Sequence, residues 1–386
     1  MKKVTLKLTA LVMLLGGAIT VSNAQTTNKI NVVTSAVPFL RITPDARSGG
    51  MGDIGIATNP DANSNFSNQA KTPFNSGNFG IGLNYVPWLR DLSVNDVYLA
   101  SLSAFYKIGD NQAITGSFRY FSLGNIQFTD ALGNNLQSYK PREFAFDLGY
   151  SRKLSKKNAL GIAIRYIHSN LASGTFSTGT YKAGSSVAGD IHFFHHGAKE
   201  SGQGLNWGIT LSNLGSKISY SSNANDKDYI PANMGLGLAY TKVFNESNKV
   251  TFGLDLNKLL VPTAKQDSAG YSSSTALAKY RSKSVVSSWF SSFGDATNGA
   301  SEELQEVSIG AGAEYWYNNQ FAFRAGYFYE NKNKGNRRYF TVGAGLKYSM
   351  FGINFAYLFP SGSGVTRNPL SNTWRFGVVF DMAGKK

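Results

Sequence analysis

The sequence predicts an all-β protein, a transmembrane outer-membrane β-barrel of about 14 antiparallel strands with an N-terminal plug. Three observations lead to this fold class. Apolar residues alternate with small or polar residues through most of the chain, as they do along strands, whose side chains repeat every second residue. The links between these alternating runs are short and long in turn. A pattern typical of an export signal precedes all of them.

The clearest alternation lies in residues 305–330. Each of the runs 305–317 and 320–330 has one apolar, aromatic face and one small or polar face, and Asn318-Asn319-Gln320 forms the turn between them. Keeping both apolar faces on the same side pairs Tyr317 with Phe321 and places Glu314 opposite Arg324. A soluble sandwich would bury the aromatic face, whereas a membrane barrel turns it to lipid and keeps the charge pair in the lumen.

Length and composition agree with a barrel. The chain has 386 residues, of which 42% are hydrophobic and 13% aromatic, so wholesale disorder is excluded. No stretch after the N-terminus is long and apolar enough to predict a transmembrane helix. The mean hydropathy of −0.20 is compatible with a membrane barrel, because each lipid-facing residue of its strands alternates with a lumen-facing one.

Alternating runs follow one another from residue 78 to the C-terminus. The predicted strands are 78–88, 96–108, 112–123, 142–154, 158–168, 186–196, 203–213, 232–244, 248–259, 305–317, 320–330, 338–348, 351–359 and 373–382. The last run alternates from Trp374 to Met382 almost at the C-terminus, where barrel closure would place it.

The links predict an orientation. Short links fall at 109–111, 155–157, 245–247, 318–320 and 349–350, with a moderate one near 197–202, and long ones fall at 124–141, 169–185, 214–231, 260–304, 331–337 and 360–372. The first link, 89–95, is the exception, because it is of modest length. Outer-membrane barrels have short periplasmic turns and longer external loops. We therefore expect both termini in the periplasm and the longest external loop at 260–304.

The same alternation assigns charged residues to the lumen. They fall opposite the lipid-type residues of their strands, where they would satisfy one another in a polar interior. This predicted lumen network comprises Arg119, Asp147, Arg165, Asp190, Asp255, Glu314 and Arg324.

The N-terminus predicts export. Lys2, Lys3 and Lys7 precede an apolar run that ends at Val21, and Ser22-Asn23-Ala24 supplies the small residues of a cleavage site. The predicted domains are therefore a signal peptide at 1–24, a plug or periplasmic segment at 25–76, and the barrel with its loops at 77–386.

The plug segment differs from the rest of the chain. Residues 25–76 are rich in Pro, Gly, Asn and Asp and lack sustained alternation, which predicts a compact irregular region. Residues 50–55 fit the pattern G-x-G-x-x-G, but a dinucleotide site needs a preceding strand and a following helix. These glycines instead indicate tight turns within a plug.

The charge and the cysteine content limit the partners and the site chemistry that the chain can have. The formal charge is +15, and an exported basic chain is expected to meet anionic lipid headgroups or lipopolysaccharide. The sequence shows no basic helix or stacking platform for nucleic acid. It contains no cysteine, which excludes disulfides, thiolate metal sites and cysteine nucleophiles. We expect no cofactor.

The four histidines are the candidate catalytic bases. His192 and His196 lie on one strand face about 13 Å apart, too far to bind one metal together. Asp190 and His192 are neighbours on that face, which leaves a weak acid–base option without an accompanying nucleophile motif.

The longest loop contains a candidate binding surface. Residues 274–293 place apolar side chains at largely helical spacing, which predicts a short amphipathic helix. It would either seal the barrel mouth or anchor a partner, since exposed aromatic side chains commonly dominate interface energies. The candidate partner- or cargo-binding residues are Val285, Val286, Trp289, Phe290 and Phe293.

Four blocks of the chain resemble the PorV family of the type IX secretion system of Bacteroidetes. They are FLRITPDARSGGMGDIGIAT (39–58), DLNKLLVPT (255–263), SVVSSWFSSFGD (284–295) and EYWYNNQFAFRAGYFYENKNKGNRRYFTVGAGLKY (314–348). The resemblance implies a barrel similar to the fourteen-stranded fatty-acid channels. It also implies a non-enzymatic role with a large translocon barrel and a surface sortase, receiving cargo by its C-terminal signal domain.

Two other functions remain open at this stage. A passive channel for fatty acids or other hydrophobic solutes has the same fold, and fold resemblance alone does not separate transport from partner binding. A barrel enzyme that modifies lipid A is the second alternative.

Overall fold

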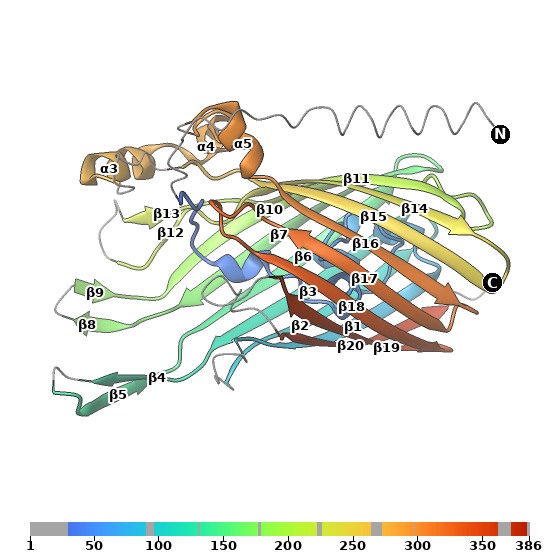
Figure 1. Cartoon of the computed structure of the whole chain (residues 1–386), viewed down its shortest axis with the longest axis horizontal. Coiled ribbons are helices and arrows are strands. Elements are labelled where there is room, and N and C mark those ends of the chain that lie inside the picture. The colour runs from blue at the N-terminus through green and yellow to red at the C-terminus, as the bar shows by residue number, and fades with distance from the viewer. Residues whose placement is uncertain are drawn as a thin grey trace. The chain divides into compact units, whose positions relative to one another are not determined.

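The computed structural model describes residues 30–89, 96–129, 132–176, 179–221, 226–263, 272–296, 298–361 and 372–383. Among these residues, fourteen strands form one closed antiparallel barrel in which each strand pairs with its sequence neighbours, and β1 pairs with β20 to close it (Figure 1). The predicted barrel of about 14 antiparallel strands is confirmed. The predicted signal peptide lies outside the described residues.

The barrel strands have 9 to 13 residues, as spans of a membrane by tilted strands require. They are β1 (Gly77–Pro87), β2 (Val97–Ile108), β3 (Gln112–Leu123), β6 (Arg142–Lys153), β7 (Asn158–Asn170), β10 (Gly184–His195), β11 (Gly204–Gly215), β14 (Asn233–Val243), β15 (Asn248–Leu259), β16 (Ser308–Tyr317), β17 (Phe321–Tyr329), β18 (Arg338–Tyr348), β19 (Phe351–Pro360) and β20 (Trp374–Ala383). All fourteen predicted strands are present.

The long links carry structure of their own. Three hairpins extend from one end of the barrel, and the same end carries three helices (Figure 1). The hairpins are β4 (Ile126–Thr129) with β5 (Asn135–Tyr139), β8 (Gly174–Phe176) with β9 (Gly179–Tyr181), and β12 (Ile218–Ser219) with β13 (Lys227–Asp228). The helices are α3 (Ser274–Ser282), α4 (Val285–Ser291) and α5 (Ala300–Gln305).

Two predictions about the longest link are corrected. The single helix expected over 274–293 is two helices, because Lys283 has extended backbone and the Ser284 side chain caps a new helix by accepting from Ser287 N–H. The strand expected to begin at 305 begins at Ser308, because α5 ends at Gln305. No helix in the described part of the chain is both long and apolar enough to cross a membrane.

The two faces of the wall differ as the alternation predicts. In β17, Phe321 and Phe323 are exposed on the outer face, whereas Ala322 and Arg324 are buried on the inner face. Cross-strand pairing places Glu314 opposite Arg324 and Tyr317 opposite Phe321, which is the register that the sequence predicts.

The N-terminal segment packs against the inner face of the wall. Its short helices are η1 (Pro38–Arg41), α2 (Ala46–Gly49), η2 (Ser64–Phe66) and η3 (Gln69–Phe74). A Cβ added at Gly312 would lie 2.3 Å from Met51 O, and one added at Gly326 would lie 2.2 Å from Gly52 N. The glycines of β16 and β17 therefore let the backbone around residue 51 approach the strands directly.

Candidate functional site

The first candidate site is the lumen, where charged side chains join the N-terminal segment to the wall. Glu314 of β16 lies at its centre: Arg324 Nε donates to its Oε2 at 2.7 Å, and Arg47 Nη2 donates to its Oε1 at 2.8 Å. Arg47 also binds Asp61 at 2.8 Å. The predicted wall pair is thus part of a larger group that includes the N-terminal segment.

A second group joins β6, β7 and β10. Arg165 pairs with Asp147 and, at 2.8 Å, with Asp190 Oδ2. The backbone N–H of Asn213 donates to Asp190 Oδ1 at 2.7 Å. All of these side chains are buried, so each needs the partners that it has.

The two remaining predicted lumen residues bind the N-terminal backbone. Asp255 of β15 accepts from the N–H groups of Gly55 and Ile56 at 2.7 and 2.9 Å. Arg119 of β3 donates to Leu40 O at 3.0 Å and lies over the Phe66 ring at 5.0 Å. The predicted lumen residues therefore form two ion-paired groups and two separate contacts with the backbone of the N-terminal segment.

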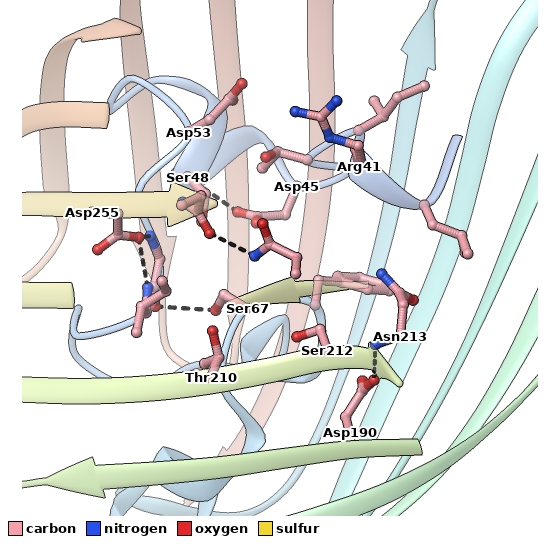
Figure 2. A pocket seen from close by; sticks show the side chains of 18 of the residues that line it. Arg41, Asp45, Ser48, Asp53, Ser67, Asp190, Thr210, Ser212, Asn213 and Asp255 are labelled. Atoms are coloured by element: carbon pink, nitrogen blue, oxygen red, sulfur yellow. Dashed lines mark hydrogen bonds between the residues drawn. The ribbon is translucent and has the colours of Figure 1, made fainter. Parts of the chain in front are cut away.

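A polar cavity of about 150 Å³ lies between the segment and the wall (Figure 2). Asp45, Ser48 and Asp53 reach it from the segment, and Asp190 and Asp255 from the strands. Figure 2 shows the Asp255 contacts with the segment on one side of the cavity and the Asp190–Asn213 contact on the other. Charged, amide, imidazole and hydroxyl side chains together form most of its lining, as is typical of cavities that hold water.

The structure gives His192 a structural contact. Its Nδ1 accepts from Gln69 N–H at 3.1 Å, whereas Asp190 binds Arg165 and Asn213. The weak acid–base option of the sequence analysis would need these two side chains to act together, and each has a different partner. The described residues hold no group of three or more His, Cys, Asp and Glu side chains placed to bind a metal ion.

The second candidate site is the surface of α4 and the residues just after it. Val286, Phe290 and Phe293 are 56%, 75% and 50% exposed, and Val285 and Trp289 are half-buried. Ser288 and Ser292 face inward and are buried. Val286 and Phe290 of the helix and Phe293 just after it thus point outward, whereas a helix that seals a core buries its apolar side chains.

Ion pairs hold this loop to the barrel. Lys258 of β15 binds Glu303 and Glu306 of the loop at 2.8 and 2.6 Å, and Lys334 of the β17–β18 link binds Glu302 and Glu306 at 2.6 and 3.0 Å. Together they fix α5 on the wall beside α4.

Further contacts hold α3 and the start of α4. Arg281 binds Asp226 and Asp228 at 2.7 and 3.2 Å. Lys217 Nζ donates to the carbonyl groups of Arg281 and Lys283, both at 2.6 Å. The exposed side chains of α4 therefore lie on a loop that is fixed on both sides.

Comparison with known proteins assigns the family. A family model described as type IX secretion system protein PorV matches residues 24–266, more than half of the chain. The chain belongs to the PorV family. The resemblance seen in residues 39–58 and 255–263 lies within this match, and the blocks at 284–295 and 314–348 lie beyond it. No curated protein matches the chain.

Solved structures of other barrels share the fold. The toluene transporter TbuX of Ralstonia pickettii has 12% identity and a TM-score of 0.51 over 88% of this chain and 98% of its own. A TodX mutant, a monoaromatic hydrocarbon channel, has 15% identity and a TM-score of 0.51 over 88% and 99%. This PorV-family chain is therefore an outer-membrane-type barrel with the fold of hydrophobic-solute channels.

Sequence reasoning did not find several residues of the lumen site. Arg47 and Asp61 belong to the irregular N-terminal segment. It lacks the strand alternation that would predict which way each side chain points. Asp53 pairs with Arg375 of β20 and accepts from the Tyr339 hydroxyl. Strand alternation places Arg375 and Tyr339 in the lumen, but it does not identify their partner.

Proposed function

We propose that the chain is a non-enzymatic outer-membrane component of the type IX protein secretion system. It partners the large translocon barrel and receives cargo by the C-terminal signal domain for delivery to the surface sortase. Membership of the PorV family supports the system, and the exposed aromatic surface of α4 supports the contact. The long-loop end faces outward, both termini are periplasmic, and the outer wall contacts membrane lipids including lipopolysaccharide.

The exposure of α4 is the observation that carries this proposal. Three quarters of Phe290 is accessible to solvent. Burial of an exposed aromatic side chain by a partner contributes favourable binding free energy. The rim-sealing role would require the same ring to be buried against the barrel. Trp289 is half-buried next to Phe290, so part of its side chain is also accessible to a partner.

The anchored loop supports a preorganised contact. A surface held by ion pairs to β15 and the β17–β18 link loses less conformational freedom on binding than a free loop does. The five residues Val285, Val286, Trp289, Phe290 and Phe293 form the proposed partner-binding patch.

The test is the triple variant Trp289→Ala/Phe290→Ala/Phe293→Ala in the native cell. We expect a normally folded barrel, co-purification with the translocon reduced at least tenfold, and cargo retained in the periplasm. Leu132→Ala is the matched control, because Leu132 is 87% exposed in another long link. Unchanged secretion and co-purification by a stably inserted triple variant would overturn the patch assignment, and a destabilised barrel would support the rim seal.

A hydrophobic-solute channel is the second candidate function. A hollow of about 340 Å³ near Phe39, Trp88 and Phe121 combines apolar rings with basic side chains, as a binding site for fatty acids would. Deleting the gene separates the two functions: surface proteins retained in the periplasm indicate secretion, and failure to grow on a fatty acid indicates transport. An altered lipid A would indicate the enzymatic alternative.

A further inference from the structure

A cavity of about 210 Å³ lies at the opposite, short-turn mouth of the barrel. Residues 59–61 and 75–76 of the N-terminal segment form one side, and Lys249, Trp316 and Lys347, each next to a short turn, line the other. Trp316 alternates with the exposed Tyr317 of the outer face, so the cavity belongs to the lumen. Membrane lipids therefore do not reach it from the outer wall.

Three residues that line this space carry buried polar atoms without a hydrogen-bond partner among the described residues. Arg324 is 4% exposed and donates to Glu314 through Nε, but its Nη1 has no hydrogen-bond partner among the described residues. Asn75 Nδ2 and Asp381 Oδ1 are also buried without a described partner. All three side chains line the cavity. A buried guanidinium N–H without an acceptor is costly, so the cavity favours a ligand that can accept.

The charges around the cavity leave one cation in excess. Arg47 and Arg324 share Glu314, and Arg47 also binds Asp61, so these four groups balance. The other charged residues of the lining are Lys249, Lys347 and Asp381. Two lysines and one carboxylate leave one positive charge in excess. Lys249 Nζ donates to the neutral amide of Asn319, and neither lysine forms an ion pair within the described residues.

The aromatic ring of Trp316 lies between the two basic groups. Lys249 Nζ is 5.9 Å and Arg324 Cζ is 5.8 Å from its centroid. Such a ring can pack against carbon atoms next to a bound charge. The site thus combines an Arg N–H without an acceptor, two lysines that share one nearby carboxylate and form no ion pair within the described residues, and an apolar surface.

We infer that this cavity binds a single carboxylate group, held by Arg324 Nη1, Lys249 and Lys347 with its carbon atoms against Trp316. A carboxylate carries the one negative charge that the lining lacks and matches the geometry of a guanidinium donor. It comes either from a small organic acid or from an Asp or Glu side chain of a protein segment at the short-turn mouth. This binding is independent of the patch on α4.

Trifluoroacetate is a suitable probe, because ¹⁹F line broadening detects weak binding to the purified full-length barrel in detergent. We expect saturable broadening that acetate removes. Lys249→Gln/Lys347→Gln should weaken it about tenfold, as expected for lost charge-assisted contacts. Lys156→Gln/Lys157→Gln at another short turn is the matched control. Heat-modifiable mobility on a gel verifies that each variant is folded.

Competition identifies the source of the carboxylate. A capped peptide with one Glu that competes at least tenfold below acetate indicates a protein segment, and equal competition indicates a small acid. The same peptide with Gln should not compete. Three results would overturn the inference: no saturable broadening in the wild type, equal broadening in the folded double-lysine variant, or stronger competition by phosphate than by acetate.

Discussion

At the scale of single residues, Glu314 is the carboxylate that joins the barrel wall to the N-terminal segment. It is fully buried and shared by two guanidinium groups, Arg47 and Arg324. Removing one partner of a buried ion pair costs about 3–5 kcal/mol when the other charge is left alone. Removing Glu314 leaves Arg324 without a carboxylate and leaves Arg47 with Asp61 alone, whereas removing either arginine leaves the carboxylate with its second partner.

The first prediction follows from this asymmetry. Glu314→Ala should destabilise the barrel by roughly 3 kcal/mol or more, and Arg324→Ala by less, because Arg47 still satisfies the carboxylate. Glu314→Ala/Arg324→Ala should recover part of the loss. Urea unfolding of the folded barrel in lipid measures all three. Equal effects of the two single variants would show that Arg47 does not share the site.

The sequence predicts only part of this arrangement, for a physical reason. A turn length and strand alternation are sufficient to place Glu314 opposite Arg324. Arg47 lies 267 positions away in a segment with neither strand nor helix periodicity, and nothing local indicates where its side chain points. The same holds for Asp53 and its partner Arg375.

Glycine positions give the second prediction. Gly326→Val should displace the N-terminal segment, because even a Cβ would lie 2.2 Å from the backbone of residues 51 and 52. Overpacking of this kind costs about 1–3 kcal/mol. Protease digestion in detergent should then cleave the segment faster. Gly116→Val is the control, since its nearest neighbours would be 3.8 Å away, and equal cleavage of both variants would contradict the packing.

At the scale of elements, the strands are predictable and the loops are not. Each strand presents one face to lipid and one to a polar lumen, so two-residue alternation continues over its full length. The helices α3 and α4 are short, and a single serine cap at Ser284 divides them. In the β4–β5 hairpin, the side chains whose burial the structure describes are exposed or half-buried, so they impose no alternation on the sequence.

A pH-dependent prediction concerns the loop that carries α4. Asp295 Oδ2 accepts from Thr263 N–H at 3.0 Å, and its Oδ1 is buried without a partner among the described residues. Burial raises the pKa of this carboxyl to about 6; the bond from Thr263 lowers it, Glu303 and Glu306 raise it, and Lys283 lowers it. The ionised form is therefore less favourable in the folded loop.

The raised pKa of Asp295 makes the stability of the folded loop depend on pH. The folded pKa lies above the ordinary value, so the folded loop loses stability as pH rises from about 4 to about 6. Asp295→Asn removes this cost and should slow proteolysis of the loop at pH 8, with little difference from the wild type at pH 4. Asp110→Asn, in a short turn at the other end, is the control. Faster proteolysis of Asp295→Asn at pH 8 would show that the carboxylate stabilises the loop.

At the scale of the whole molecule, a fourteen-stranded barrel is wider than one whose lumen its own side chains can fill. Barrels of about eight strands are filled by their own side chains, and those of sixteen to eighteen leave an aqueous channel. Here the N-terminal segment contacts strands around the circumference, through Asn63 to β1 and β2, Asn65 to β3, Asn68 to β10 and Asp255 of β15 to Gly55.

These contacts lead to the prediction that residues 25–76 plug the barrel. The purified wild-type protein should show no large ion conductance in a planar bilayer, because polar bonds join the segment to the wall in several directions. Deleting residues 25–76 should open a conductance of the size expected for an unobstructed lumen. Gly326→Val, which retains the whole chain, should give partial or intermittent opening if the deletion variant fails to fold. A large conductance in the wild type would overturn the plug, as would a folded deletion variant that remains closed.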